Sequence, residues 1–254
     1  MASTLNLIGS LAASSAALWR GTMSRPAARQ PVKTLQLYEM ENCPYCRLVR
    51  EVLTELEIDV LIYPCPKRGE RFRPEAIRLG GKAQFPFLVD PNTDLQLYES
   101  ADIIAYLYTT YGECKIPSMW RLKLVDTTSS MLASGLRTTK GMFARPSSPA
   151  QKPLVLWGFE SSPYARLVRE RLCELEVPYI IRNIGKAQWQ DFALTPIRNR
   201  LWPDFEHLSE NRQALKAKTG QVMAPYLEDP NSGVSMFESD EIIDYLDETY
   251  GRLT

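Results

Sequence analysis

The amino-acid sequence predicts an α/β protein in which one structural unit occurs twice in tandem. The main observation is an internal repeat, because Pro-Tyr-x-Arg-Leu-Val-Arg-Glu-x-Leu occurs at residues 44–53 and again, without a gap, at 163–172. Two further pairs of matching segments follow in the same order, at 87–92 and 226–231, and at 98–104 and 237–243. Units of this size are domains rather than solenoid repeats, and a chain of 254 residues can hold two of them.

Each repeat has the same expected order of elements. An apolar strand leads through a turn into an amphipathic helix, a β-rich run and a polar region with helical character. A strand after a proline, an Asp-Pro-Asn turn, a short strand and a final helix that begins at Glu-Ser complete the unit. The expected strands and helices, in the first and second repeat, are 35–38 and 154–157, 44–56 and 163–175, 58–63 and 178–182, 87–89 and 226–228, 95–98 and 234–237, and 100–110 and 239–249. This order is that of a thioredoxin-like fold, so we expect two such domains, each with a four-stranded mixed sheet flanked by helices.

Composition and charge exclude several classes of protein. The 30 basic and 30 acidic residues give a net charge of zero, whereas nucleic-acid-binding domains are clearly basic. No uncharged apolar run is as long as a transmembrane helix. Five cysteines are too few and too irregular for a disulfide scaffold, and the single histidine, His207, cannot build a His-based metal site. Thiol chemistry, carboxylate chemistry or binding without catalysis remain.

The amino-terminal residues 1–34 have the composition of an organelle transit peptide. They are rich in Ser and Ala, carry Arg20, Arg25 and Arg29, and precede the first acidic residue, Glu39. We expect import into the chloroplast, with the mitochondrion as the alternative; a tail without a targeting role is the simpler explanation. Both compartments keep thiols reduced, so a cysteine pair would be redox-active rather than structural.

Cys43 and Cys46 are the candidate catalytic residues. Cys43-Pro44-Tyr45-Cys46 follows an expected strand and opens an expected helix, the context of a redox Cys-x-x-Cys motif. At a helix N-terminus the unpaired N–H groups and the helix dipole stabilise a thiolate, which makes Cys43 the nucleophile. Cys46, one turn further in, can resolve a mixed disulfide. Half of a zinc site is the alternative, but no second Cys or His pair completes it.

Cys-Pro-Tyr-Cys is the motif of glutaredoxins, and Phe85-Pro86 and Glu99-Ser100 resemble the glutathione-binding elements of glutaredoxins and glutathione S-transferase N-terminal domains. The resemblance implies that a cis Pro86 exposes the backbone of Phe85 to the cysteinyl part of glutathione. It also implies that Glu99 and Ser100 hold the γ-glutamyl group and that Tyr45 belongs to the same site. A serine at a helix N-cap suits a carboxylate on independent grounds, although a plain helix cap and a tight turn would also explain these residues.

More closely, the chain resembles plant and algal organellar proteins with two tandem glutathione S-transferase N-terminal domains, over residues 35–112 and 154–251. Two departures from the pattern matter. The all-helical C-terminal domain of the transferases has no counterpart of adequate length. Glutaredoxins often carry a lysine shortly before the motif, whereas this chain has Glu41, which opposes thiolate formation while Arg47 and Arg50 offset it.

The second repeat lacks the thiols, because Ser162 and Ala165 stand at the positions of Cys43 and Cys46. Ser162 resembles the hydroxyl residue with which some glutathione transferases stabilise the glutathione thiolate. Together with Ala224, Pro225, Glu238 and Ser239 it makes up a candidate glutathione site. Two explanations of the second repeat are equally good. It binds glutathione without disulfide exchange, or it is a degenerate copy kept for packing.

Residues outside these motifs carry weaker signals. We expect Cys173 to be a buried structural cysteine, Cys65 to be a flexible-loop residue or a third redox thiol, and His207, in an insertion at 183–220, to be a surface or packing residue. Residues 113–150 form a helical, locally basic connector. It either docks between the domains or contacts an anionic membrane surface through 115–145.

The sequence therefore predicts a transit-peptide-like tail (1–34), a glutaredoxin-like domain (35–112), the connector (113–150) and a second domain without the active-site cysteines (151–254). The expected function is glutathione-dependent reduction of protein mixed disulfides by Cys43, with glutathionylated or disulfide-bearing proteins as partners. Whether the site turns over stays open. The alternatives are a glutathione-ligated [2Fe–2S] carrier that uses Cys43 and a non-catalytic scaffold in an organellar assembly.

Overall fold

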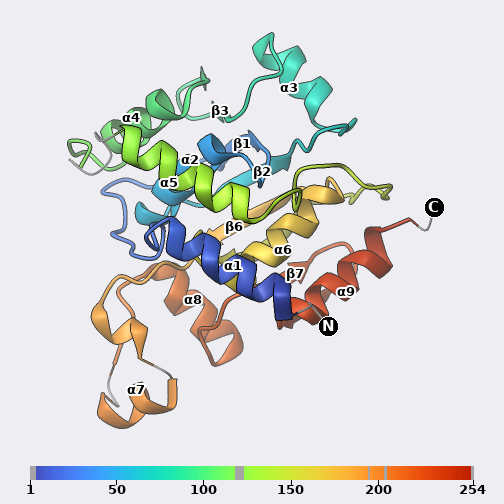
Figure 1. The fold of residues 1–254 in the computed structure, drawn as a ribbon. Helices are drawn as coiled ribbons and strands as arrows, with labels where there is room; N and C mark the ends of the chain where they lie inside the picture. The colour runs from blue at the N-terminus through green and yellow to red at the C-terminus, as the bar shows by residue number, and fades with distance from the viewer. Residues whose placement is uncertain (1–3, 118–122, 194, 203–204, 253–254) are drawn as a thin grey trace.

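The computed structural model describes residues 4–117, 123–193, 195–202 and 205–252 (Figure 1). Part of the expected connector, residues 118–122, lies outside the described residues. In chain order the elements are α1 (Thr4–Ala16), β1 (Leu35–Glu39), α2 (Pro44–Glu55), β2 (Val60–Pro64), α3 (Arg73–Gly80), β3 (Phe87–Asp90), β4 (Leu95–Leu97), α4 (Ser100–Thr110), α5 (Lys123–Leu136), β5 (Leu154–Gly158), α6 (Pro163–Glu174), β6 (Tyr179–Asn183), the 3₁₀ helix η2 (Trp189–Phe192), α7 (Thr195–Leu201), α8 (Glu210–Thr219), β7 (Tyr226–Asp229), β8 (Val234–Phe237) and α9 (Ser239–Tyr250). The predicted α/β class is confirmed, and both repeats have the predicted element order.

The strands form one eight-stranded mixed sheet in the order β4-β3-β1-β2-β6-β5-β7-β8. Each repeat contributes four strands, and the second half of the order is the first half reversed. In each repeat the first two strands are parallel and the last two are antiparallel additions. The repeats are therefore related by a pseudo-two-fold axis that passes through the middle of the sheet.

The joint between the repeats is the antiparallel pair of β2 and β6. Leu61 lies opposite Ile180, its own counterpart in the repeat, with Val60 opposite Ile181 and Ile62 opposite Tyr179. Two separate four-stranded sheets were expected, and the structure differs on this point. The physical reason is that β2 and β6 are apolar edge strands, and an edge strand with free N–H and C=O groups pairs readily with another. One continuous core follows.

Helices cover both faces of the sheet. On one face α2, α4, α6 and α9 pack on the strands around a shared apolar core that includes Leu37, Val52, Leu156 and Val168. On the other face α3 and α8 each cover a smaller cluster, around Phe87 and Leu215 respectively. The insertion of the second repeat forms η2 and α7, beside α8. None of the helices in the described parts of the chain is long and apolar enough to cross a membrane.

Helices α1 and α5 lie side by side as an outer layer on α6 and α2 (Figure 1). Each packs on the opposite repeat: α1, which precedes the first repeat, on α6, and α5, which precedes the second, on α2. The contacts match. The Ser10 hydroxyl donates to the Pro163 carbonyl at 2.8 Å, and the Ser130 hydroxyl donates to the Pro44 carbonyl at 2.7 Å. The repeats thus exchange their leading helices.

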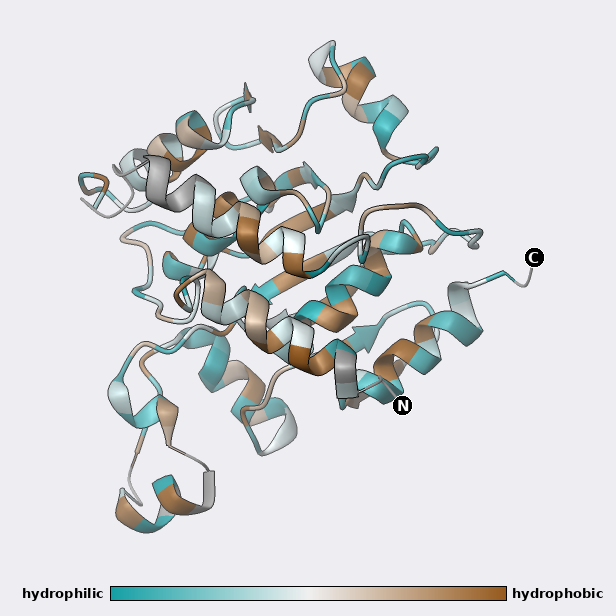
Figure 2. Cartoon of the chain, viewed as in Figure 1, coloured by the Kyte–Doolittle hydropathy of each residue, from teal (hydrophilic) through white to brown (hydrophobic). Residues whose placement is uncertain are grey.

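The segments after these helices repeat the exchange. Met23 forms a parallel bridge with Lys186, and Phe143 forms the same bridge with Lys67. Residues 4–34, expected to be a tail outside the domains, are therefore part of the fold. Helix α1 lies close to α6 because the residues on its contact side are small. They are fully buried and comprise Ser10, Ala13, Ser14 and, just after the helix, Ala17. Figure 2 shows α1 mainly in white and brown, in keeping with its lack of charged residues.

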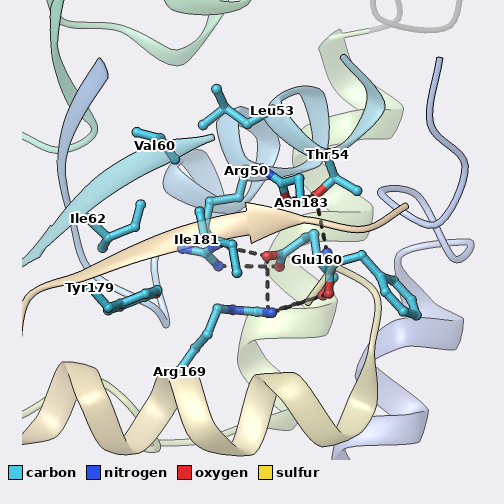
Figure 3. Close-up of a pocket in the computed structure, with 11 residues that line it drawn as sticks. Arg50, Leu53, Thr54, Val60, Ile62, Glu160, Arg169, Tyr179, Ile181 and Asn183 are labelled. Atoms are coloured by element: carbon cyan, nitrogen blue, oxygen red, sulfur yellow. Dashed lines mark hydrogen bonds and ion pairs between the residues drawn. The ribbon is translucent and has the colours of Figure 1, made fainter. Parts of the chain in front are cut away.

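Buried charges lie beside the pseudo-two-fold axis (Figure 3). Arg50 pairs with Glu160 at 2.9 Å, and its counterpart Arg169 pairs with Glu41, the counterpart of Glu160, at 3.1 Å. Arg169 also reaches Glu160 at 3.0 Å, and Arg50 reaches Glu41 at 3.3 Å. Burial alone would raise the pKa of Glu160, but Arg169 and Arg50 outweigh it and hold that pKa well below its usual range. Two arginines and two glutamates thus form a crossed four-membered network that joins the repeats.

We expect Arg169→Met to destabilise the protein by about 3–5 kcal/mol, because it removes one of the two arginines that neutralise the buried Glu41 and Glu160. The matched control is Arg182→Met, which removes the half-exposed ion pair of Arg182 with Asp59 and should cost about 0–1 kcal/mol. Urea unfolding at pH 7 measures both. Equal losses in the two variants would show that the crossed network is not a main source of stability.

Candidate functional site

Cys43 is the N-cap residue of α2. Its backbone is extended (φ −93°, ψ 121°), and Pro44 occupies the first helical turn, where the missing N–H costs nothing. The Cys46 backbone N–H donates to the Cys43 sulfur at 3.5 Å, and the Cys43 N–H donates to the Met40 carbonyl at 2.9 Å. The sulfur is therefore held where the free N–H groups of the helix converge.

The two thiols of this site have opposite electrostatics. A hydrogen bond from the Cys46 side chain lowers the pKa of Cys43 to about 7; burial opposes it, while the Cys46 and Tyr45 N–H groups and the charge of Arg50 add to it. Burial and the neighbouring Cys43 raise the pKa of Cys46 well above its usual value. Of the two thiols, Cys43 is therefore the more readily ionised. Glu41 is paired with Arg169 of the other repeat and also with Arg50, in keeping with the expectation that Arg50 offsets its charge.

The other predicted residues of the first repeat gather at the same edge of the sheet. Pairing of Tyr38 with Phe87 places the cis Phe85–Pro86 bond beside the end of β1, where the Cys43 loop begins. Pairing of Leu88 with Leu97 brings Glu99 and Ser100, at the start of α4, to that edge. Glu99 has a φ of 62°, a strained value for a non-glycine residue, and its carboxylate accepts a hydrogen bond from Gln84. Tyr45 is exposed.

The second repeat has the same geometry without the thiols. Ser162 is the N-cap residue of α6, and its hydroxyl accepts the Ala165 N–H at 3.2 Å. The Ala224–Pro225 bond is cis, and Glu238, before Ser239, has a φ of 68°. The N-cap residue of this set is thus a hydroxyl in place of a thiol.

The exchanged helices cover both N-caps. In the first repeat Ser130 of α5 bonds Pro44, the Asn42 amide donates to the Thr138 carbonyl at 2.6 Å, and Cys43 is only 8% exposed. In the second repeat Ser14 of α1 donates to the Ser161 carbonyl at 2.7 Å, and Ser162 is 2% exposed. Both N-cap side chains are therefore largely shielded from solvent.

The remaining cysteines do not join the site. Cys65 and Cys173 are buried, and burial raises the pKa of each thiol. Cys173 is structural as expected, since it accepts the Glu41 N–H and donates to the Gly141 carbonyl. Cys65 is neither a flexible-loop residue nor an exposed thiol, because its N–H bonds the Glu39 carbonyl under α3. Cys114 is exposed, and all five thiols are free. Within the described residues no group of three or more His, Cys, Asp or Glu side chains is arranged to hold a metal ion.

The sequence interpretation missed a basic cavity of about 280 Å³ in the second repeat. It is lined on one side by Ala224, which precedes the cis proline, and Phe159, and on the other by Lys186, Arg198 and Arg212. His207, expected at the surface or in packing, is buried and bonds Asp191, which also pairs with Arg212. The clue in the sequence was the basic character of the insertion at 183–220. Only the fold brings its Arg198 close to Ala224 and the cis Pro225.

Comparison with known proteins gives the family. A model of the glutathione S-transferase N-terminal domain matches residues 37–115 and again 156–253. The chain therefore belongs to the glutathione S-transferase N-terminal domain family, whose fold is thioredoxin-like and whose ligand is glutathione.

Among solved structures, the Bombyx mori glutathione transferase BmGSTD1 matches with 29% identity and a TM-score of 0.30, over 34% of this chain and 39% of that chain. Its complex with GTT matches with 27% identity and a TM-score of 0.31, over 37% and 45%. Leishmania TDR1, a trimeric glutathione transferase, matches with 13% identity and a TM-score of 0.29, over 88% and 68%. The chain thus spans less than half the length of the silkworm enzyme. No curated protein matches the chain significantly.

We expect alkylation of Cys43 by iodoacetamide to rise with pH along a curve with its midpoint near 7, because only the thiolate reacts. Mass spectrometry of the modified peptides at each pH measures this, with exposed Cys114 as the internal reference and buried Cys65 and Cys173 unmodified. A midpoint at the ordinary thiol value, near 8.5, would contradict the N-cap geometry as the source of activation.

Proposed function

We propose that the protein is a glutathione-dependent thiol–disulfide oxidoreductase that removes glutathione from protein or small-molecule mixed disulfides. The observation that carries the proposal is the Cys43 thiol, which sits at a helix N-cap with its pKa lowered to about 7. The cis Pro86 and the Glu99-Ser100 pair at the same sheet edge support a glutathione site next to that sulfur. Membership of a glutathione-binding family agrees with it.

The reaction has two balanced steps. The Cys43 thiolate attacks the glutathione sulfur of the mixed disulfide, so that a Cys43–glutathione disulfide forms and the substrate leaves as a thiolate that takes up a proton. A second glutathione, as its thiolate, then attacks the bound glutathione sulfur, which releases oxidised glutathione and restores the Cys43 thiolate. Cys46 offers a second route: its sulfur attacks Cys43, reduced glutathione leaves, and a Cys43–Cys46 disulfide remains for reduction by two further glutathiones.

The first experiment compares wild type, Cys43→Ser and Cys46→Ser in glutathione-dependent reduction of a glutathionylated peptide. Cys43→Ser should fall to the uncatalysed background, whereas Cys46→Ser should keep activity because the first route needs one thiol. Cys114→Ser is the matched control and should equal wild type. Activity that survives Cys43→Ser would refute the assignment.

Two other outcomes would support the alternative functions. Visible absorbance that depends on Cys43 after anaerobic purification would support the [2Fe–2S] carrier. Stable co-purification with other proteins, without turnover, would support the scaffold.

We further propose that the second repeat binds glutathione without disulfide exchange. The basic cavity beside Ala224 supports this, because Lys186, Arg198 and Arg212 offer cations to a carboxylate-bearing peptide next to a cis proline. Ser239 at the start of α9 is the counterpart of Ser100.

Calorimetric titration with glutathione should give two molecules bound per chain in the wild type. Ser100→Ala and Ser239→Ala, which change the same atom in the two repeats, should each lose one of them, since each removes a carboxylate partner at one helix start. If Ser239→Ala leaves the stoichiometry and affinity unchanged, the second repeat is a packing copy.

A further inference from the structure

A small cavity of about 10 Å³ lies where α2, α5 and α6 meet, and it has room for a single particle about the size of a water molecule. Its charged lining consists of four cations, Arg47, Arg137, Lys140 and Arg166, and two carboxylates, Glu41 and Glu170. Residues from both repeats line the cavity, which lies under the end of α5 and beside the Asn42 side chain, one residue before Cys43. It is separate from the thiol chemistry proposed above.

The guanidinium of Arg166 is buried but largely unpartnered. Its side chain is among the largest fully buried ones, at 2% exposure, and its Nη1 donates to the Ser10 carbonyl at 2.7 Å. Among the residues that the structure describes, nothing accepts a hydrogen bond from its Nε or Nη2, or from the Nη2 of Arg47. Buried donors of charged groups are costly to leave unpaired, so the site calls for an acceptor.

Comparison of the repeats explains why Arg166 has no carboxylate. In the first repeat Arg47 pairs with Glu51, one turn along α2, at 3.0 Å. The counterpart of Glu51 is Glu170, but Arg137 binds both of its oxygens, at 2.6 and 2.7 Å. Ser10 and Ser130 make matching contacts, so α1 and α5 align at an offset of 120 residues. At that offset Arg137 is the counterpart of Ala17. In the first repeat Arg20 pairs with one oxygen of Glu51 and leaves the other to Arg47. In the second repeat Arg137 takes both oxygens of Glu170, so neither is left for Arg166.

The other acidic group of the lining cannot compensate. Glu41 is already held by Arg169 and Arg50, and Lys140 adds a further cation from the exposed rim. Burial, followed by the charge of Arg47, lowers the pKa of Arg166 to about 9, in keeping with an excess of positive charge. A neutral water could accept the hydrogen bonds, but it would leave that charge uncompensated, whereas an anion satisfies both needs.

We propose that this cavity is a binding site for a small monovalent anion of the halide type, with chloride as its ligand, held by Arg166 and Arg47. The small space and the three unpaired donors suit a single-atom ion better than sulfate, phosphate or a carboxylate. The bound ion neutralises the interface between α5, α2 and α6, and so stabilises the helix that covers Cys43.

Crystals of the full chain grown in sodium bromide test the site directly. An anomalous bromide peak within hydrogen-bond distance of Arg166 and Arg47 supports the proposal. Density without an anomalous signal at this position overturns the proposal. Such density would be a water that bridges the Asn42 side-chain oxygen to Arg166.

Thermal unfolding gives a second, independent test. At matched ionic strength the wild type should have a higher Tm in sodium chloride than in sodium gluconate, whose anion is too large for the cavity. Arg137→Ala, which restores the residue of the first repeat and frees Glu170 for Arg166, should lose that difference while staying folded. Arg166→Met should lose it too, and exposed Arg25→Ala should keep it. Equal chloride dependence in wild type and Arg137→Ala, or none in the wild type, would overturn the proposal.

Discussion

Two arginines and two glutamates, crossed between the repeats beside the pseudo-two-fold axis, constrain the rest of the structure. Arg50 and Arg169 lie on the helices that begin at the two N-caps, and Glu41 and Glu160 lie in the loops just before those helices. All four are buried, so each charge needs its partners, and each arginine pairs with one glutamate of its own repeat and one of the opposite repeat. The pairing of β2 with β6 and the position of both N-cap loops are therefore fixed together. The pKa of Cys43 is linked to this network, because the charge of Arg50 is one of the causes that lower it.

The exchange of α1 and α5 follows from the same symmetry. Once the sheet is continuous, α2 and α6 lie close to the axis, and a helix that precedes one repeat can reach the N-cap of the other. Small residues permit the close approach, and serine hydroxyls satisfy the carbonyls of Pro163 and Pro44. Each N-cap is thereby shielded from solvent. In this arrangement access to a site is a property of the whole chain, since the helix that covers Cys43 belongs to the second repeat.

Much of the fold and part of the site could be predicted from the sequence. Periodicity, turn residues and the repeat gave the element order, and the Cys-Pro-Tyr-Cys context identified the N-cap thiol, because these signals are local. The sheet joint could not be predicted, since nothing local distinguishes an edge strand that meets water from one that meets its own copy. The repeat itself extends further upstream than the motifs suggest: Ser10, Ala13, Gly21 and Arg25 have counterparts in Ser130, Ala133, Gly141 and Arg145. These residues match at an offset of 120, one more than the 119 that separates the two Pro-Tyr motifs. That match is the signal that would have placed α1 and α5 in the fold.

The differences between the repeats are concentrated around this symmetric framework. The first repeat keeps the thiols at the N-cap, while the second has serine and alanine there and an insertion that adds Arg198 to the cavity beside its cis proline. The crossed charges are preserved in both repeats, since Arg169 and Glu160 are the counterparts of Arg50 and Glu41, whereas Ala17 is replaced by a charged residue, Arg137. A duplicated core can lose thiol chemistry on one side without losing stability, because the crossed charges, not the cysteines, hold the halves together. The two sites can thus diverge, one toward disulfide exchange and the other toward binding, on a single shared sheet.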